Sequence, residues 1–349
     1  MVNFTCSHSK RWLPYSAGLY IFALLSAFSC TAASAQSNAP SPSFFPDGDV
    51  GSTAPLSRTN PPATILPPLT QPTATLPAKP LATPPSALPL PALVTNAPAL
   101  SNALVDQESQ SLHAAFQQEV SHAPPPPAEL QALWISLARQ QLESSQYRPG
   151  NSQVVVLVDR NPKVQRLSLV VINLNDQTWR IIGSTRVSTG KKGRKDYYIT
   201  PVGVFTNTAN RLGYRALGTK NEHGIMGNGT HGMRVWDFGW QQGTKGWLAN
   251  HEQGPMRLEM HATDPYILEK KLGHTASAGC IRIPAPLNIF LDRHGLLDAD
   301  YEQKSHTDKR FLALLRKDRT PSPLSGVAVI VIDTSNTVKT SPFTHTHHL

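Results

Sequence analysis

The distribution of proline constrains this chain more than any other feature. Of its 31 prolines, 20 lie between Pro40 and Pro127, in a stretch that is otherwise mostly Ala, Ser, Thr and Leu. Such a stretch favours polyproline II, which has no internal hydrogen bonds, so it cannot form a packed domain. We therefore expect a disordered arm over residues 36–128 and one folded domain in the roughly 200 residues that follow.

The first 35 residues predict a secretory signal peptide. Lys10 and Arg11 precede an apolar stretch at 13–28, and Ala33-Ser34-Ala35 supplies the small residues that a signal peptidase requires. We expect cleavage after Ala35, with an uncleaved anchor as the alternative. No later apolar run reaches the length of a membrane span, so we expect an exported protein without stable membrane insertion.

Positive charge concentrates in the second part of the chain. After residue 128 there are 28 Lys and Arg against 18 Asp and Glu. A basic domain can favour nucleic acid, an anionic membrane surface or an anionic polymer. The basic residues are scattered and no nucleic-acid module is recognisable, so we expect a soluble surface with a positive excess and no nucleic-acid partner.

Beyond residue 128 the hydrophobic pattern predicts a mainly β domain over 152–335, followed by a disordered tail at 336–349. Runs rich in Val, Ile and Leu predict strands over 153–159, 166–173, 179–187, 197–205, 256–261 and 327–333. Leucines at near-helical spacing predict an amphipathic helix over 129–148, and further helices are expected over 287–295 and 309–317. Short strands without alternating long helices argue for a mainly antiparallel fold.

Cys280 is the only cysteine left after signal cleavage, because Cys6 and Cys30 precede the cleavage site. It cannot form an internal disulfide, so it is either a buried inert side chain or a reactive one. A cysteine nucleophile needs a base, backbone donors for an oxyanion and a cation that holds an anionic substrate. His261, Gly279 and Arg282 are the respective candidates.

The residues around Cys280 resemble the signature of the L,D-transpeptidase catalytic domain, the YkuD-like family. This resemblance is carried by His261-Ala262, Leu272-Gly273, Ser277-Ala278-Gly279-Cys280-Ile281-Arg282, and the upstream segments 188–191 (STGK) and 200–205 (TPVGVF). It covers about residues 152–285, with an extension to Asp333. It implies a YkuD-like antiparallel β-sandwich or barrel with short helices.

The resemblance implies acyl transfer on peptidoglycan tetrapeptide stems in the periplasm, at the cell wall, without a cofactor or metal. Cys280, activated by His261, would attack the carbonyl that joins the third-position diamino acid to the terminal D-Ala. D-Ala would leave, and the side-chain amine of a second stem would resolve the thioester into a cross-link between third-position residues. The carbonyl of Ala262 would orient the imidazole, and Ser277, Gly279 and Arg282 would serve the substrate or the oxyanion.

Two residues depart from the family pattern, which has glycine at Ala262 and histidine at Ala278. The second change removes an imidazole beside the cysteine and bears on thiolate stabilisation. Three alternatives therefore stay open. Water as the acceptor would give an L,D-carboxypeptidase. A wall-linked protein could be the acceptor or the group released by an endopeptidase. The third alternative is a non-catalytic peptidoglycan-binding module.

Other chemistry-bearing residues have competing interpretations. His231, His251 and His274 lack the spacing of zinc ligands, so we expect no metal site. Asp264 is either a carboxylate that orients His261 or a helix N-cap. The aromatic residues at 234–240 are expected either to line a substrate groove or to form a core cluster. The glycine-rich stretch 224–232 predicts a loop near the cleft.

Overall fold

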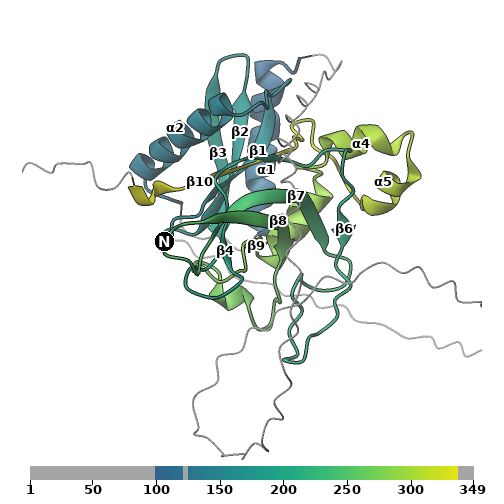
Figure 1. The fold of residues 1–349 in the computed structure, drawn as a ribbon. Helices are drawn as coiled ribbons and strands as arrows, with labels where there is room; N and C mark the ends of the chain where they lie inside the picture. Colours follow the sequence, from purple (N-terminus) through teal and green to yellow (C-terminus); the bar gives the residue numbers. More distant parts are fainter. Residues whose placement is uncertain (1–98, 121–124, 337–349) are drawn as a thin grey trace, which may run out of the picture. The chain divides into compact units, whose positions relative to one another are not determined.

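The computed structural model describes residues 99–120 and 125–336. The expected signal peptide, the part of the arm before residue 99 and the tail after residue 336 lie outside the described residues. Over the described residues the chain forms two mixed β-sheets with a few helices, so the fold is mostly β (Figure 1). This arrangement is consistent with a β-sandwich.

The first sheet has five strands, and two of its neighbouring inner strands run parallel. Its order is β3 (Thr178–Arg186), β2 (Arg166–Asn173), β1 (Gln153–Asp159), β10 (Ala328–Ile332) and β5 (Gly203–Thr206). β1 and β10 pair parallel, and the other pairs are antiparallel. Every residue of β1 and β10 is buried, which explains why both sequences are continuous apolar runs rather than alternating ones.

The second sheet carries one polar face. Its order is β4 (Tyr198–Ile199), β7 (Arg234–Lys245), β8 (Gln253–Ala262) and β9 (Ile281–Ile283), and β6 (Tyr214–Arg215) also pairs with β7. Burial alternates along most of β8, so one face of the strand packs inward and the other carries polar side chains. Because β8 and β9 run parallel, the expectation of a mainly antiparallel domain is correct only in part.

The core lies in two layers on either side of the first sheet. A large cluster joins this sheet to the inner face of the second one and includes Val156, Leu169, Trp236 and Met260. A smaller cluster lies between the first sheet and α2 (Ala128–Ser144), whose Trp134 is 1% exposed. Helix α2 confirms that a helix begins near residue 129, but it ends at Ser144 rather than at the expected residue 148.

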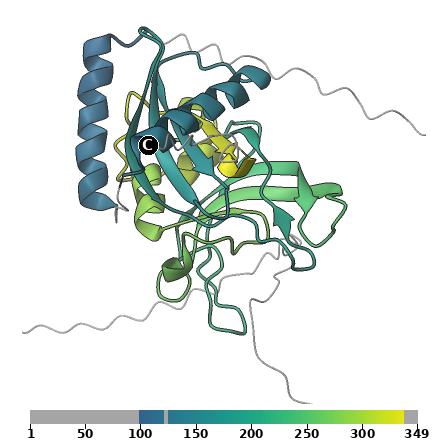
Figure 2. The same ribbon diagram turned by 90° about the vertical axis from the view of Figure 1, so that its left-hand side faces the viewer.

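Helix α1 (Asn102–Glu119) corrects the expectation of an arm that stays disordered up to residue 128. Its Phe116 is fully buried and meets Phe290 edge-to-face with ring centroids 5.7 Å apart. Figure 2 shows α1 and α2 on different sides of β1–β3. The helix depends on apolar contacts with distant segments, which the local sequence does not reveal.

The remaining differences concern the middle of the chain. The strand expected over 197–205 is split into β4 and β5, which belong to different sheets. Pro201 lies at the crossing, where a missing N–H costs no ladder hydrogen bond. Strands β6, β7 and β9 were not predicted, nor was helix α4 (Ala299–Ser305), whereas α3 (Ala285–Arg293) and α5 (Lys309–Leu314) lie where helices were expected.

Candidate active site

Two neighbouring strands of the second sheet bring His261 and Cys280 to one face. In the parallel pair of β8 and β9, Met260 lies opposite Ile281 and His261 lies opposite Arg282. Met260 and Ile281 are fully buried in the core. Because successive side chains point to opposite faces of a sheet, His261 and Arg282 lie on the other face, together with Cys280 two residues earlier.

His261 is a neutral imidazole with one ring nitrogen engaged. Its Nδ1 lies 2.7 Å from the backbone oxygen of Ala262. Since a carbonyl only accepts, Nδ1 carries the proton and donates it. The side chain is 5% exposed, and burial lowers the pKa of His261 to about 4. Nε2 therefore keeps its lone pair at neutral pH, as a general base requires.

The turn that leads to Cys280 is closed by the side chain of Ser277. Its hydroxyl donates to the Cys280 carbonyl at 2.5 Å and accepts from the Gly279 N–H at 3.2 Å. Gly279 has a φ of 137°, and a Cβ there would lie 2.7 Å from Cε of Met256, so the turn requires glycine. The Gly279 N–H was a candidate oxyanion donor, but here it is bonded within the turn.

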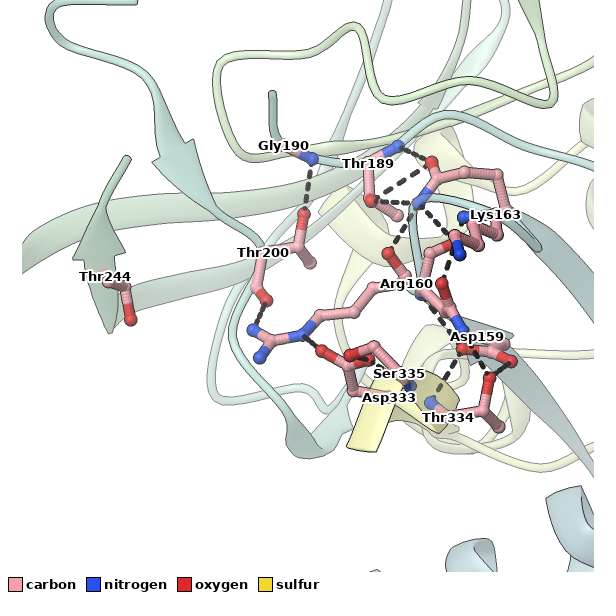
Figure 3. Close-up of polar contacts among 12 residues, drawn as sticks. Asp159, Arg160, Lys163, Thr189, Gly190, Thr200, Thr244, Asp333, Thr334 and Ser335 are labelled. Atoms are coloured by element: carbon pink, nitrogen blue, oxygen red, sulfur yellow. Dashed lines mark hydrogen bonds and ion pairs between the residues drawn. The ribbon is translucent and has the colours of Figure 1, made fainter. Parts of the chain in front are cut away.

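A buried threonine ties this turn to the first sheet. The hydroxyl of Thr200 donates to the Gly279 carbonyl at 2.7 Å and accepts from the Gly190 N–H at 2.9 Å. The Thr200 carbonyl accepts from Arg160, which in turn pairs with Asp333 at 2.9 Å (Figure 3). Sequence reasoning assigned no role to Thr200, although it opens one of the segments that resemble the family.

The family-like segment 188–191 runs directly beside the Cys280 turn. Ser188 exchanges two backbone hydrogen bonds with Arg282, of 3.0 and 2.8 Å, and the Lys191 N–H donates to the Ser277 carbonyl at 2.9 Å. The two stretches of sequence that carry the resemblance are therefore neighbours in space. Together with Thr200 they hold the backbone around the cysteine in one conformation.

The Cys280 thiol is protonated at neutral pH. Its side chain is only partly exposed, and Sγ lies 3.7 Å from the backbone oxygen of Arg257. Burial raises the pKa of Cys280 to about 12, and the nearby carboxylate of Glu259 adds to this rise. A nucleophilic attack by this sulfur would therefore require loss of the proton during the attack rather than before it.

Polar side chains from β6, β7 and β8 flank the cysteine. The Tyr214 hydroxyl donates to Glu259, 3.1 and 3.2 Å from the two carboxylate oxygens. Arg257 lies 2.6 Å from Asp237 and 3.5 Å from Glu259. Burial and the Asp237 charge raise the pKa of Glu259. Sequence reasoning missed this group, because Tyr214 and Glu259 lie 45 positions apart.

Arg282, the strand partner of His261, lines a cavity of about 630 Å³. Its Nη1 donates to the carbonyl of Ala276 at 3.3 Å. Thr263, which follows β8, lines the same cavity. The cation that the sequence proposed is therefore the strand partner of His261 and also lines this cavity.

Asp264 has a structural role, but it caps a turn rather than the helix that was one of its two interpretations, because the N-cap of the following 3-10 helix is Leu268. Its carboxylate accepts from the N–H groups of Met226, Tyr266 and Ile267 at 3.0, 2.9 and 2.8 Å. It therefore caps the turn that follows β8. Because Met226 belongs to the glycine-rich stretch 224–232, this stretch is a loop beside the site, as expected.

The aromatic residues of β7 divide between the two predicted roles. Trp236 and Phe238 are 0% and 2% exposed and belong to the core, whereas Trp240 is 71% exposed. The core interpretation is thus confirmed for Trp236 and Phe238. Trp240 lies on the strand next to β8, where it remains available to a ligand.

The histidines that were considered as zinc ligands have separate surroundings. His231 Nδ1 lies 3.2 Å from the Leu217 carbonyl, and His274 lines the cavity beside Arg282. In the described part of the chain, no group of three or more His, Cys, Asp or Glu side chains is placed to hold a metal ion. Across residues 99–120 and 125–336, no helix has the length and apolarity to cross a membrane.

The site thus combines a cysteine on a tightly bonded turn, a neutral imidazole on the adjacent strand and an arginine beside a cavity. Such a set can perform acyl transfer by general-base-assisted attack of the sulfur. The chain matches none of the protein-family models with which it was compared, and no curated protein matches it.

Proposed function

We propose that this chain is an L,D-transpeptidase that acts on the tetrapeptide stems of peptidoglycan. The observation that carries the proposal is that His261 lies on β8 and Cys280 lies directly before the adjacent strand β9, with Nδ1 of His261 bonded to the carbonyl of Ala262. Nε2 is then the basic nitrogen on the face that carries the cysteine. Nucleophilic acyl transfer requires this arrangement of base and nucleophile.

In the first step, Nε2 of His261 takes the proton from Sγ of Cys280 as the sulfur attacks the carbonyl carbon before D-Ala. Negative charge then develops on the carbonyl oxygen of the substrate. We assign the Cys280 N–H as its backbone donor, since the Gly279 N–H is bonded to Ser277. When the carbon–nitrogen bond breaks, the leaving amine of D-Ala takes the proton from His261. A thioester on Cys280 remains.

In the second step, the side-chain amine of another stem attacks the thioester. The amine gives a proton to His261, the carbon–sulfur bond breaks, and the departing sulfur recovers that proton. The product is an amide between two third-position residues, and the enzyme returns to its starting state. Because burial favours the uncharged forms of both His261 and Cys280, the first step begins from a neutral thiol and a neutral imidazole, and the second begins from the thioester and a neutral imidazole.

The departures from the family pattern are compatible with this proposal. Ala262 is not among the non-glycine residues with positive φ, so its methyl group is tolerated while its carbonyl still meets the imidazole. The carbonyl of Ala278 accepts from the Tyr198 N–H at 3.0 Å, which anchors the turn without a second histidine. In this proposal proton transfer depends on His261 alone.

The proposal includes an exported, periplasmic location at the cell wall, which follows from the expected signal peptide. It includes no cofactor. The partners are peptidoglycan stems, with a wall-linked protein as the alternative acceptor.

Incubation of the purified protein with disaccharide-tetrapeptide, followed by mass spectrometry, tests the proposal. We expect cross-linked dimers that have lost one D-Ala from the wild type, and unchanged substrate from Cys280→Ala and His261→Gln. Tripeptide monomers without dimers would replace the transpeptidase by a carboxypeptidase. Unchanged substrate with the wild type, despite measurable binding, would favour a peptidoglycan-binding module.

A further inference from the structure

The cavity beside Arg282 is strongly cationic. Its volume is about 630 Å³, which is within the usual range for small-molecule sites. No Asp or Glu is found among the described residues that line it. Five of the lining side chains are cationic at neutral pH: Lys191, Arg194, Lys270, Lys271 and Arg282.

The walls of the cavity are fixed to each other and to the cysteine turn. One wall comes from the segment that contains Ser188 and Lys191, and the other from η1 (Glu269–Lys271) and the residues after it. Backbone hydrogen bonds of 2.7 to 3.1 Å join them, from Gly273 to Val187 and from residues 276 and 277 to Thr189. The positive charges are therefore gathered on a preformed backbone rather than on a loose loop.

Glu269 directly precedes Lys270 and Lys271 in the sequence, but its carboxylate is hydrogen-bonded to another segment. The carboxylate of Glu269 accepts from the N–H of Ala285 at 3.0 Å, at the start of α3. None of the ion pairs among the described residues involves Lys191, Lys270 or Lys271. Several cations around one cavity repel one another, so an anionic ligand there would remove an unfavourable interaction.

We propose that this cavity binds the free carboxylates of the acyl-donor peptide and thereby selects multiply acidic stems over amidated ones. The inference rests on the proposed function, because it places the non-reacting part of the donor in the cavity. Arg282 joins the two regions: it lines the cavity, and its strand partner is His261. A peptide whose reacting carbonyl lies at Cys280 would extend past Arg282 toward the lysines, which attract carboxylates.

Binding to the Cys280→Ala protein tests this proposal without turnover. The probes are a tetrapeptide stem with free carboxylates on its second-position glutamate and third-position diamino acid, and the same peptide with both groups amidated. We expect the acidic peptide to bind about tenfold more tightly, and added salt to reduce this preference. Lys270→Gln with Lys271→Gln should weaken its binding about fivefold and leave the amidated peptide unaffected.

The matched control is Lys309→Gln with Lys317→Gln, which removes the same charge from exposed lysines that do not line the cavity. We expect this control to bind like the parent protein. Equal affinity for the two peptides would overturn the proposal, as would a cavity variant that binds like the control. Inorganic pyrophosphate that binds more tightly than the acidic peptide would overturn it in favour of a phosphate site.

The outcomes separate this inference from the proposed function. If the wild type cross-links both peptides at equal rates, the proposed selectivity is wrong and the transpeptidase function is supported. If the acidic peptide binds in a charge-dependent way but no cross-linking occurs, the cavity is supported as a carboxylate site and the transpeptidase function is wrong.

Discussion

The hydroxyl of Thr200 donates a hydrogen bond of 2.7 Å to the carbonyl of Gly279, the residue before the nucleophilic cysteine of the proposed mechanism. The same oxygen accepts from the Gly190 N–H at 2.9 Å. One fully buried side chain therefore joins the two segments that resemble the L,D-transpeptidase family. Because the Gly279 carbonyl is held in this way, the peptide plane that carries the Cys280 N–H is held as well.

Replacement of Thr200 by valine keeps the shape of the side chain and removes both hydrogen bonds. We expect a loss of about 2 kcal/mol in the free energy of unfolding, because two buried backbone groups lose their partner. We also expect a lower kcat, since the oxyanion donor loses its support. Denaturant unfolding and steady-state kinetics measure the two effects. Thr200→Ser keeps the hydroxyl and should retain most of the stability and most of the kcat. Equal losses in the valine and serine variants would contradict the role of the hydroxyl in holding the turn.

Gly279→Ala should abolish most activity. The substitution introduces a side chain at a φ of 137° and places its Cβ 2.7 Å from Cε of Met256, at a cost of about 1–3 kcal/mol. Gly193→Ala is the matched control, because Gly193 has a φ of 92° and nothing within 4 Å of a built Cβ. We expect the control to keep near-normal turnover. An active Gly279→Ala protein would show that the turn is not restricted to glycine.

The acidic limb of the pH profile should report His261. Burial lowers the pKa of His261 to about 4, so the imidazole remains a neutral base as the pH falls through 6.5 and gains a proton only near 4. The kcat/KM value should therefore hold down to about pH 5 and then fall. Circular dichroism over the same range checks that the protein stays folded. A fall centred near pH 6.5, the ordinary value for histidine, would contradict the buried neutral base.

Glu259 should control the reactivity of the thiol. Its carboxylate adds to the rise in the pKa of Cys280 that burial causes, so Glu259→Gln should lower that pKa. The rate of alkylation by iodoacetamide at a fixed pH near 8 should then increase, in line with the thiolate fraction. Glu252→Gln removes an exposed carboxylate that pairs with Lys245 and should leave the rate unchanged. A slower rate for Glu259→Gln would reverse the assigned electrostatic effect.

The parts of the fold that the sequence predicted are those whose burial is strongest. The strands at 153–159 and 166–173 coincide with β1 and β2, because continuous Val and Leu runs reflect a sheet that is covered on both sides. Strand β7 was missed because Gly239, with a φ of 76°, and several polar residues interrupt its pattern. Helix α1 was missed because its stability depends on contacts such as that of Phe116 with Phe290.

The candidate site also has a part that the sequence predicted and a part that only the structure shows. The motif pointed to Cys280, His261, Ala262 and Arg282, and the structure places the last three on β8 and β9 and Cys280 in the turn directly before β9. Thr200 and the lysine-lined cavity could not be predicted, because their contacts join segments that are distant in sequence. The same limit applied to the Ser277 hydroxyl, whose bonds to its own turn are visible only in three dimensions.

The most direct test of the proposed mechanism is the intact mass of the protein shortly after it is mixed with tetrapeptide stem. The mechanism predicts a covalent adduct whose mass equals the stem without D-Ala, located on Cys280 by peptide mapping, absent from Cys280→Ala and discharged by an added acceptor amine. Substrate turnover without such an adduct, or an adduct that persists in Cys280→Ala, would contradict acyl transfer through this cysteine.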